Sequence, residues 1–151
     1  KQKMKFYYGD LTERQFRNIF KKASNTKGDT SQILIELLER RLDATVYRMK
    51  FVPTIFAARQ LVNHGHVKVN GKRVNIPSFS VSDGDEISIK DKSKEINLIV
   101  ESISSQEREI PEYLEVDVKE LKGRFLRAPL IHDVPYPVTM EPNLVIEYYS
   151  R

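Results

Sequence analysis

The sequence contains no cysteine among its 151 residues. Without thiols the chain can form neither disulfides nor thiolate metal sites, and it has no cysteine nucleophile. This composition fits a reducing compartment, although it does not by itself assign one. No apolar run approaches the ~18 residues of a membrane-spanning helix, and no secretory leader opens the sequence. Because the first residue is Lys1 rather than methionine, we expect that a segment precedes it.

Several catalytic signatures are also missing. Neither G-x-x-x-x-G-K-[ST] nor G-x-G-x-x-G occurs, so nucleotide hydrolysis and dinucleotide binding have no support. His132 and Asp133 could hint at a hydrolase triad, but no G-x-S-x-G accompanies them. His64 and His66 lie two residues apart, whereas a metal site needs three or four ligands. We therefore expect no catalytic residue, no cofactor and no metal, and we interpret the histidines as polar loop or phosphate-contacting groups.

The charges are distributed unevenly along the chain. Residues 1–75 hold 16 Lys and Arg against 6 Asp and Glu, a balance of +10. Residues 76–151 hold 9 against 15, a balance of −6. Such an asymmetry indicates one face for a polyanion and another for a different partner. The alternative is a chance imbalance of solvated charges, and we favour nucleic acid.

The first half of the sequence has helical periodicity. The first ten residues alternate basic and aromatic side chains and are interpreted as a basic arm or loop. Thr12 and Gln15 fit a capping box. Gly65 is suited to close the last of these helices at its C-terminus. Four helices are expected, and their N-caps are, in order, Thr12, Thr30 or Ser31, Asp43 and Thr54.

The period changes to that of strands after Gly65. Asn70-Gly71 between alternating residues predicts a β-hairpin over 66–76. The remaining expected elements are a turn at 81–85, a strand over 85–90, a helix over 93–106, a strand over 113–121 ended by Gly123, and an ordered loop over 128–143. The apolar segment 144–149 is too short for its periodicity to decide between helix and strand.

Basic and amide side chains from helices and hairpin can converge on one surface. The fourth helix turns Arg59, Gln60 and Asn63 away from its apolar face, and Arg41 and Arg48 are two helical turns apart. Arg forks and Lys charges suit phosphates, while Asn and Gln can read 2′-hydroxyls or base edges. The alternative is a solvated face with internal ion pairs, such as Arg41 with Asp43. The candidate RNA-binding residues are Arg41, Arg48, Thr54, Arg59, Gln60, Asn63, His64, Lys68, Asn70, Lys72 and Arg73, with possible further contacts from Lys3, Lys5, Arg14, Arg17 and Lys21.

The segment over 41–76, RLDATVYRMKFVPTIFAARQLVNHGHVKVNGKRVNI, resembles the RNA-binding module first described in small-subunit ribosomal protein four. That module also occurs in pseudouridine synthases, a tyrosyl-tRNA synthetase and a heat-shock RNA-binding protein. The flanks YYGDLTERQFRNIFKKA, PEYLEVDVKELKGRF and NLVIEYYSR are similar to the bacterial or organellar family of ribosomal protein four itself. Members of that family have a further N-terminal segment, cysteine-bearing in some, so its rRNA contacts and any zinc are not carried over to this sequence.

The resemblance implies an α+β fold, with a mainly helical lobe formed by 1–40 and 105–151 and an inserted RNA-binding domain over 41–104. It also implies a structural constituent of the small ribosomal subunit that binds the 5′ domain of 16S-type rRNA, nucleates assembly and contributes to translational accuracy. The implied partners are this rRNA, ribosomal protein five of the small subunit and mRNA near its entrance, with no membrane. The implied location is the cytoplasmic ribosome, and the alternative is an organellar ribosome.

Two other functions use the same module. An RNA-modifying enzyme such as a pseudouridine synthase would need a catalytic aspartate in a separate domain, and the 47 residues after position 104 are too few for one. A heat-shock RNA binder predicts neither flank. We therefore expect a structural RNA-binding protein rather than an enzyme.

Overall fold

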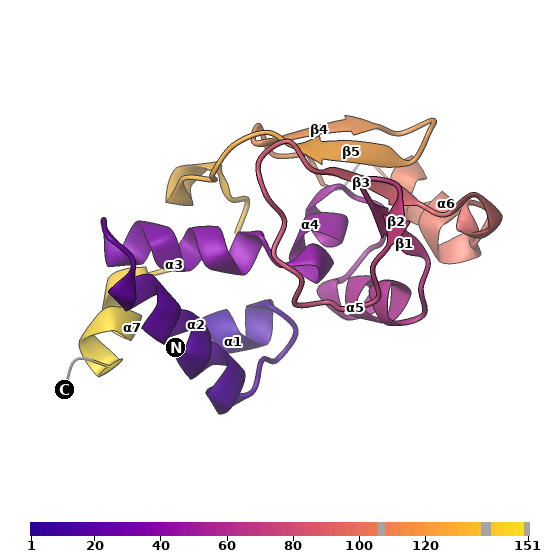
Figure 1. Ribbon diagram of the computed structural model, residues 1–151. Helices are drawn as coiled ribbons and strands as arrows, with labels where there is room; N and C mark the ends of the chain where they lie inside the picture. The colour runs from indigo at the N-terminus through magenta and orange to yellow at the C-terminus, as the bar shows by residue number, and fades with distance from the viewer. Residues whose placement is uncertain (106–107, 137–139, 150–151) are drawn as a thin grey trace. The chain divides into compact units, whose positions relative to one another are not determined.

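The computed structural model describes residues 1–105, 108–136 and 140–149. It divides the chain into two compact units, a helical unit of residues 1–39 and 129–151 and a mixed unit of residues 40–128. Helices and one antiparallel sheet make up the described structure (Figure 1), which confirms the α+β class. None of the helices in the described ranges combines the length and the hydropathy that crossing a bilayer demands.

The helical unit contains both ends of the described chain. Helix α3 packs against α2 and α7, and the apolar positions Phe16, Leu34 and Val145 are almost completely buried. The elements of this unit are α1 (Gln2–Tyr7), α2 (Glu13–Asn25), α3 (Thr30–Glu39), the short 3₁₀ helix η2 (Ile131–Asp133) and α7 (Pro142–Tyr149).

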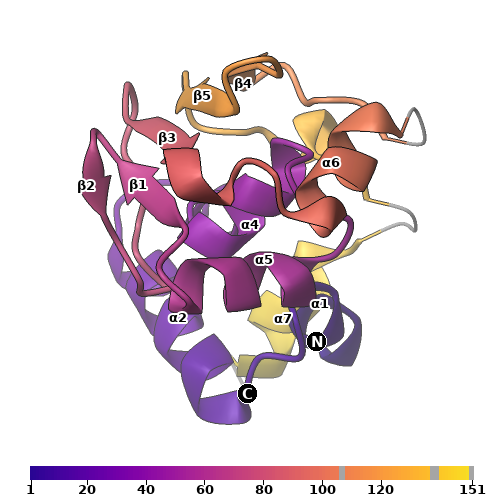
Figure 2. The same ribbon diagram turned by 90° about the vertical axis from the view of Figure 1, so that its right-hand side faces the viewer.

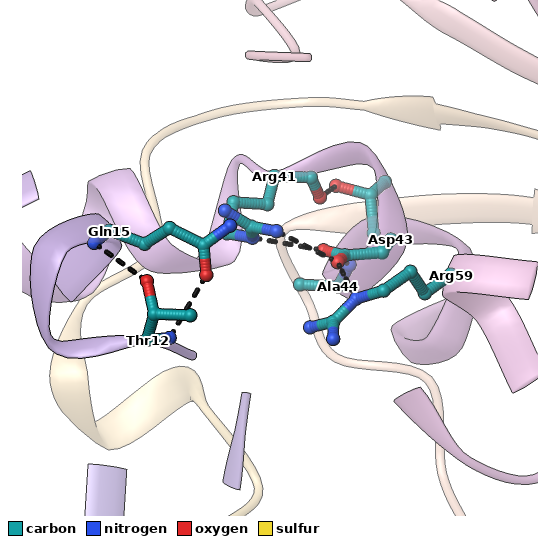
Figure 3. A network of polar contacts seen from close by, with 7 residues as sticks. Thr12, Gln15, Arg41, Asp43, Ala44 and Arg59 are labelled. Atoms are coloured by element: carbon teal, nitrogen blue, oxygen red, sulfur yellow. Dashed lines mark hydrogen bonds and ion pairs between the residues drawn. The ribbon is translucent and has the colours of Figure 1, made fainter. Parts of the chain in front are cut away.

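The start of the chain differs from its predicted form as an arm or loop. Residues Gln2–Tyr7 form α1 because Met4 and Tyr8, one helical turn apart, are both buried in this unit. The Tyr8 hydroxyl donates a hydrogen bond to the Glu39 carboxylate, which anchors the end of α1. The capping box at α2 is confirmed, since the Thr12 Oγ1 accepts from the Gln15 amide at 3.1 Å and the Gln15 Oε1 from the Thr12 amide at 3.0 Å (Figure 3).

The mixed unit is built around a five-stranded antiparallel sheet with the order β2-β1-β3-β5-β4. Helices α4 and α5 cover one face of this sheet (Figures 1 and 2). Alternate strand residues such as Val67, Ile87 and Phe125 are buried on that side. The elements are α4 (Leu42–Arg48), α5 (Ile55–Asn63), β1 (Val67–Val69), β2 (Lys72–Arg73), β3 (Glu86–Ile89), η1 (Asp91–Ser93), α6 (Asn97–Ser104), β4 (Leu114–Asp117) and β5 (Lys122–Phe125).

The strand predicted over 113–121 is shorter than expected, because only β4 (Leu114–Asp117) forms there, and a second strand, β5, follows over Lys122–Phe125. Gly123 does not end a strand but lies inside β5, opposite Ile87 on β3 and Val116 on β4. A Cβ at this position would lie 2.8 Å from the Glu115 carbonyl oxygen and 2.9 Å from the Met49 sulfur, so only glycine fits. Because β5 pairs with β3, residues 105 and 108–128 lie in the mixed unit, whereas the helical lobe was expected to contain them.

Smaller differences concern element ends. Arg41, not Asp43, is the N-cap of α4. The helix predicted over 93–106 begins only at Asn97, and its predicted apolar face is not fully buried, because Val100 is 45% exposed while Ser102 is buried. The predicted loop over 128–143 contains η2 and the first residues of α7, and its residues 137–139 lie outside the described ranges. The undecided segment 144–149 is helical.

Glu13 connects three helices of the helical unit. Its Oε1 accepts from the Lys1 Nζ at 2.9 Å and from the Tyr149 hydroxyl at 2.8 Å, and its Oε2 accepts from the Lys5 Nζ at 3.0 Å. The hydrogen bond from Lys1, followed by those from Tyr149 and Lys5, lowers the pKa of Glu13 to about 2. Burial, followed by the bond to Glu13, raises the pKa of Tyr149 to about 12.

We predict that this cluster makes the helical unit sensitive to acid. Because the folded pKa of Glu13 lies below its ordinary value of 4.5, the stabilisation is fully present above that pH and is lost as the pH falls towards about 2. Glu13→Gln should therefore lower the urea midpoint at about pH 6 and have a much smaller effect at about pH 2.5. Circular dichroism checks this, with the exposed Glu120→Gln as control. A Glu13→Gln effect that is equal at both pH values would contradict the prediction.

Candidate nucleic-acid interface

Helix α5 ends in a turn that leads the chain directly into the hairpin. Thr54 is its N-cap, as predicted, and its side chain accepts from the Ala57 amide at 3.0 Å. At the other end Gly65 has a φ of +78°, its amide donates to Val62 O at 3.0 Å, and the His66 amide donates to Leu61 O at 3.2 Å. These two bonds form a Schellman motif, which satisfies the last carbonyls of the helix. The predicted role of Gly65 is confirmed, and the C-terminus of α5 is held beside β1.

The hairpin turn has the predicted geometry. Asn70 and Gly71 have φ angles of +51° and +82°, and Val69 pairs with Lys72 across the turn, as a two-residue type I′ turn requires. The Asn70 side chain accepts from the Glu86 amide at 2.9 Å and donates to the Asp85 carboxylate at 2.9 Å. Asn70, predicted to contact RNA, therefore holds the turn against the start of β3.

Arg73 brings the hairpin and the end of α5 together. It lies opposite Lys68 in the β1–β2 pair, so both side chains project from the same face of the sheet. A Cβ at Gly65 would lie 3.2 Å from both Cζ and Nε of Arg73, which places the guanidinium group directly over the Gly65 backbone. Both ribbon views show α5 next to β1 and β2 (Figures 1 and 2). The structure thus places one hairpin cation, Arg73, at the C-terminal end of α5.

We call the solvent-facing polar residues of this region the α5–hairpin surface. Most of its side chains are exposed, while those of Arg59 and Lys68 are half-buried. No Asp or Glu occurs anywhere over 44–82, so this surface has no carboxylate of its own segment to neutralise it. The members are Arg59, Gln60, Asn63, His64, Lys68, Lys72 and Arg73.

Arg41 and Arg48 were predicted to lie on this surface, but both are buried. They are only 7% and 4% exposed. Arg41 forms a two-pronged hydrogen bond with Asp43, at 3.2 Å from Nε and 3.0 Å from Nη2 (Figure 3). Arg48 lies over the Tyr47 ring, 5.4 Å from its centroid. For Arg41 the internal ion pair, the alternative considered from the sequence, is what the structure shows, because the buried Asp43 carboxylate requires a counter-charge.

Lys90 extends the basic region and was missed from the sequence, whereas the neighbouring Lys94 is paired with Asp91 at 3.1 Å. The Lys90 amide donates to His66 O at 2.8 Å, and the His66 Nδ1 is 2.6 Å from the Ser93 hydroxyl, so η1 lies against the start of β1. Burial lowers the pKa of His66, with smaller effects from the charges of His64 and Lys90. A lysine-rich run, KDKSK over 90–94, indicates this basic extension in the sequence. The prediction divided the run between the strand over 85–90 and the helix over 93–106, so its lysines were not considered together.

The two histidines do not form the core of a metal site in the described residues. The ring centroids of His64 and His66 are 6.3 Å apart, and no group of three or more His, Cys, Asp or Glu side chains suited to a metal occurs in the ranges that the structure describes. Of the further RNA contacts predicted in the helical unit, Lys5 is paired with Glu13. The others, Lys3, Arg14, Arg17 and Lys21, are exposed.

The comparisons with known proteins agree with this geometry. The family described as "S4 domain" matches residues 40–87, and the "Ribosomal protein S4/S9 N-terminal domain" matches residues 1–39. Small ribosomal subunit protein uS4 of Ruegeria pomeroyi is 61% identical over 151 residues, which cover 100% of this chain and 73% of that protein. The uS4 proteins of Paramagnetospirillum magneticum and Rhodospirillum rubrum are 62% and 57% identical, over 100% of this chain and 74% of each. The chain belongs to the uS4 family.

The family matches divide the uS4 chain where its structure divides. The boundary between residues 39 and 40 is also the boundary between the helical and mixed units at their first junction. The S4 domain match ends inside β3, whereas the sheet continues through β5 and β4. The α5–hairpin surface lies entirely within the matched segment, while Lys90 and Lys94 lie just beyond it.

We predict that Gly65 is needed for two separable reasons. In Gly65→Ala and in Gly71→Ala the left-handed backbone should cost each chain about 1–3 kcal/mol of stability. Only the Gly65→Ala methyl group meets Arg73, since a Cβ at Gly71 has nothing within 4 Å. Urea unfolding should therefore show losses of similar size, while the ¹⁵N resonance of the Arg73 Nε should shift only in Gly65→Ala. An unshifted Arg73 resonance in Gly65→Ala would contradict the placement of this guanidinium.

Proposed function

We propose that this uS4-family chain is a structural constituent of the small ribosomal subunit and binds small-subunit rRNA through the α5–hairpin surface. The observation that carries the proposal is that Arg73 of the hairpin lies over Gly65 at the end of α5, in a segment, 44–82, without carboxylates. Membership of the uS4 family supports the ribosomal setting, because the relatives bear the name of a small-subunit protein.

The chemistry of this surface suits structured RNA. Arg59 and Arg73 carry planar guanidinium groups that can bind phosphate oxygens through two hydrogen bonds, and Lys72 adds an exposed point charge. Gln60 and Asn63 can donate to and accept from the 2′-hydroxyls and base edges that line the shallow minor groove of RNA. Phosphate contacts supply most of the affinity, whereas these two amides supply recognition of RNA.

The finer role follows from the family resemblance and remains part of the proposal. In it, the chain binds the 5′ domain of 16S-type rRNA as a primary binder, nucleates subunit assembly and contributes to translational accuracy. Ribosomal protein five and mRNA near its entrance are the proposed further partners, and the ribosome is the proposed location. The exposed carboxylates of Glu112, Glu115 and Asp117 on the β4 side repel phosphates and suit contact with solvent or a basic protein.

An RNA-modifying enzyme is the alternative function, and the structure gives it little support. The residues after α6, which would have to supply a catalytic domain, form β4 and β5 of the module's own sheet and then η2 and α7 of the helical unit. The buried Asp43 is engaged by Arg41, Arg59 and the Ala44 amide, so it is not placed as a nucleophile. We therefore propose a binding protein without catalytic activity, and turnover of RNA by the purified chain would overturn this.

We predict that individual cations of the surface contribute differently to RNA binding. Arg59→Ala should weaken binding to an rRNA 5′-domain fragment by about 1–3 kcal/mol, the value of charge-assisted hydrogen bonds. Lys72→Ala should cost less and remove one phosphate contact, which lowers the salt dependence by roughly 0.7–0.9 log units of affinity per log unit of salt. A salt titration of the binding constant checks both changes.

Lys119→Ala is the control, since this exposed lysine lies between β4 and β5, on the acidic side of the sheet. It should leave both the affinity and the salt slope close to those of the parent. Circular dichroism monitors folding. If the folded Arg59→Ala and Lys72→Ala chains bind as tightly as the parent at every salt concentration, the α5–hairpin surface is not the RNA site.

A further inference from the structure

Asp43 is a buried carboxylate at the start of α4, with two arginines on it (Figure 3). Its side chain is 1% exposed. The Oδ1 atom accepts from the Ala44 amide at 2.7 Å and from the Arg41 Nε at 3.2 Å. The Oδ2 atom accepts from the Arg41 Nη2 at 3.0 Å and from the Arg59 Nε at 3.4 Å. One carboxylate thus connects the start of α4 to a member of the α5–hairpin surface.

The arrangement makes Asp43 a rigid acceptor for Arg59. The bidentate bond to Arg41 and the bond from the Ala44 amide fix both carboxylate oxygens. The Asp43 amide also donates to Pro77 O at 3.1 Å, which fixes the backbone. The Arg59 guanidinium is held by its Nε edge, and its terminal nitrogens point away from Asp43 (Figure 3). With 28% of the Arg59 side chain exposed, the group is oriented while part of it remains accessible.

We propose that Asp43 is a positioning residue for RNA binding, which holds the Arg59 guanidinium in the orientation that meets a backbone phosphate. This inference rests on the proposed function of the α5–hairpin surface. An unrestrained arginine loses rotamer freedom when it binds a phosphate, and an arginine oriented in advance loses less. The trio Arg41, Asp43 and Arg59 has a net charge of +1, so one phosphate balances it.

The positioning role predicts that removal of the Asp43 charge weakens RNA binding, whereas the change in net charge alone predicts stronger binding. Removing a carboxylate near a phosphate site raises the local positive charge, which by itself strengthens binding of a polyanion. Loss of the positioning contact weakens binding instead. The isosteric change Asp43→Asn removes the charge and keeps the shape of the side chain, so the direction of its effect separates the two explanations.

A charge-matched control is present in the same unit. Asp83 accepts a hydrogen bond from the Arg40 Nη2 at 2.7 Å, but its side chain is 59% exposed. Asp83→Asn therefore changes the net charge by the same amount and also breaks an arginine–aspartate pair. We expect Asp83→Asn to bind the rRNA 5′-domain fragment as tightly as the parent or slightly more tightly.

A double-mutant cycle with Arg59→Ala distinguishes positioning from general destabilisation. In the parent background, Asp43→Asn should weaken binding about three- to tenfold, as expected for residues in direct contact. In the Arg59→Ala background, Asp43→Asn should have little further effect, because the side chain that it positions is gone. A purely structural role of Asp43 would weaken binding by the same factor in both backgrounds, and that result would overturn the proposal.

A second measurement needs no change at Asp43 and applies even if the variant does not fold. The Nε–H group of Arg59 in the free parent chain should show a high ¹⁵N order parameter, well above that of the exposed Arg14 on α2. Order parameters of the same low size for Arg59 and Arg14 would overturn the proposal. So would a folded Asp43→Asn chain that binds RNA as tightly as the parent or more tightly.

The two proposals fail in different ways. If Arg59→Ala binds RNA like the parent, the α5–hairpin surface is not the RNA site and the positioning role is lost with it. If Arg59→Ala weakens binding and Asp43→Asn does not, the RNA site stands and only the positioning role of Asp43 is overturned.

Discussion

Packing of α4 and α5 against one face of the sheet is the constraint on which the binding surface depends. The inward strand residues are apolar and buried, and Gly123 leaves the space that the Met49 side chain occupies. Side chains alternate along a strand, so the residues between them have to face outwards. Lys68 on β1 and Arg73 on β2 reach solvent on the opposite side because Val67 and Val69 fill the core. The packing of the core therefore determines which strand side chains are presented to solvent.

Burial and internal ion pairs limit how many of the basic residues can meet an anion. Arg41 and Arg48 are buried, Arg40 is paired with Asp83, and Lys1 and Lys5 are paired with Glu13. A balance of +10 over residues 1–75 is thus partly internal charge compensation. The Arg41–Asp43 contact illustrates the reason, because a carboxylate that is 1% exposed is stable only with a counter-charge and hydrogen bonds. Lys72 and Arg73 of the α5–hairpin surface remain exposed, whereas Arg59 is paired with Asp43.

Sequence signals predicted the structure at several caps and turns, whose conformation depends on a few neighbouring residues. The caps at Thr12 and Thr54, the helix end at Gly65 and the turn at Asn70 each depend on a few neighbouring residues, and each was predicted. The helix α1 and the division of 113–125 into two strands were not, because they depend on contacts with distant residues. Helix α1 forms because the unit buries Met4 within it and Tyr8 at its C-cap, and β5 exists because it pairs with β3, more than thirty positions earlier.

In the candidate site, residue type alone predicted some features, whereas others depend on contacts between distant segments. Residue type identified Arg59, Lys72 and Arg73 as exposed or partly exposed cations, and the structure places them so. Residue type could not show that the Asn70 amide is used within the fold, since its partners Asp85 and Glu86 are contributed by the start of β3. Nor could it show that Lys90 lies next to His66. These assignments depend on strand register, which alternation alone does not fix between distant segments.

The strand order converts a charge asymmetry along the chain into one across a single sheet. Cross-strand partners share a face, so one outward row contains, from β2 to β4, Arg73, Lys68, Ser88, Lys122 and Asp117. Arg124 on β5 lies between Glu86 and Glu115 in the next row, and its Nη2 is 3.5 Å from the Glu86 carboxylate. Cations on the β5–β4 side are therefore compensated by facing acids, whereas Lys68 and Arg73 face each other. On this outward face, a polyanion is attracted to the β1–β2 end and repelled towards β4.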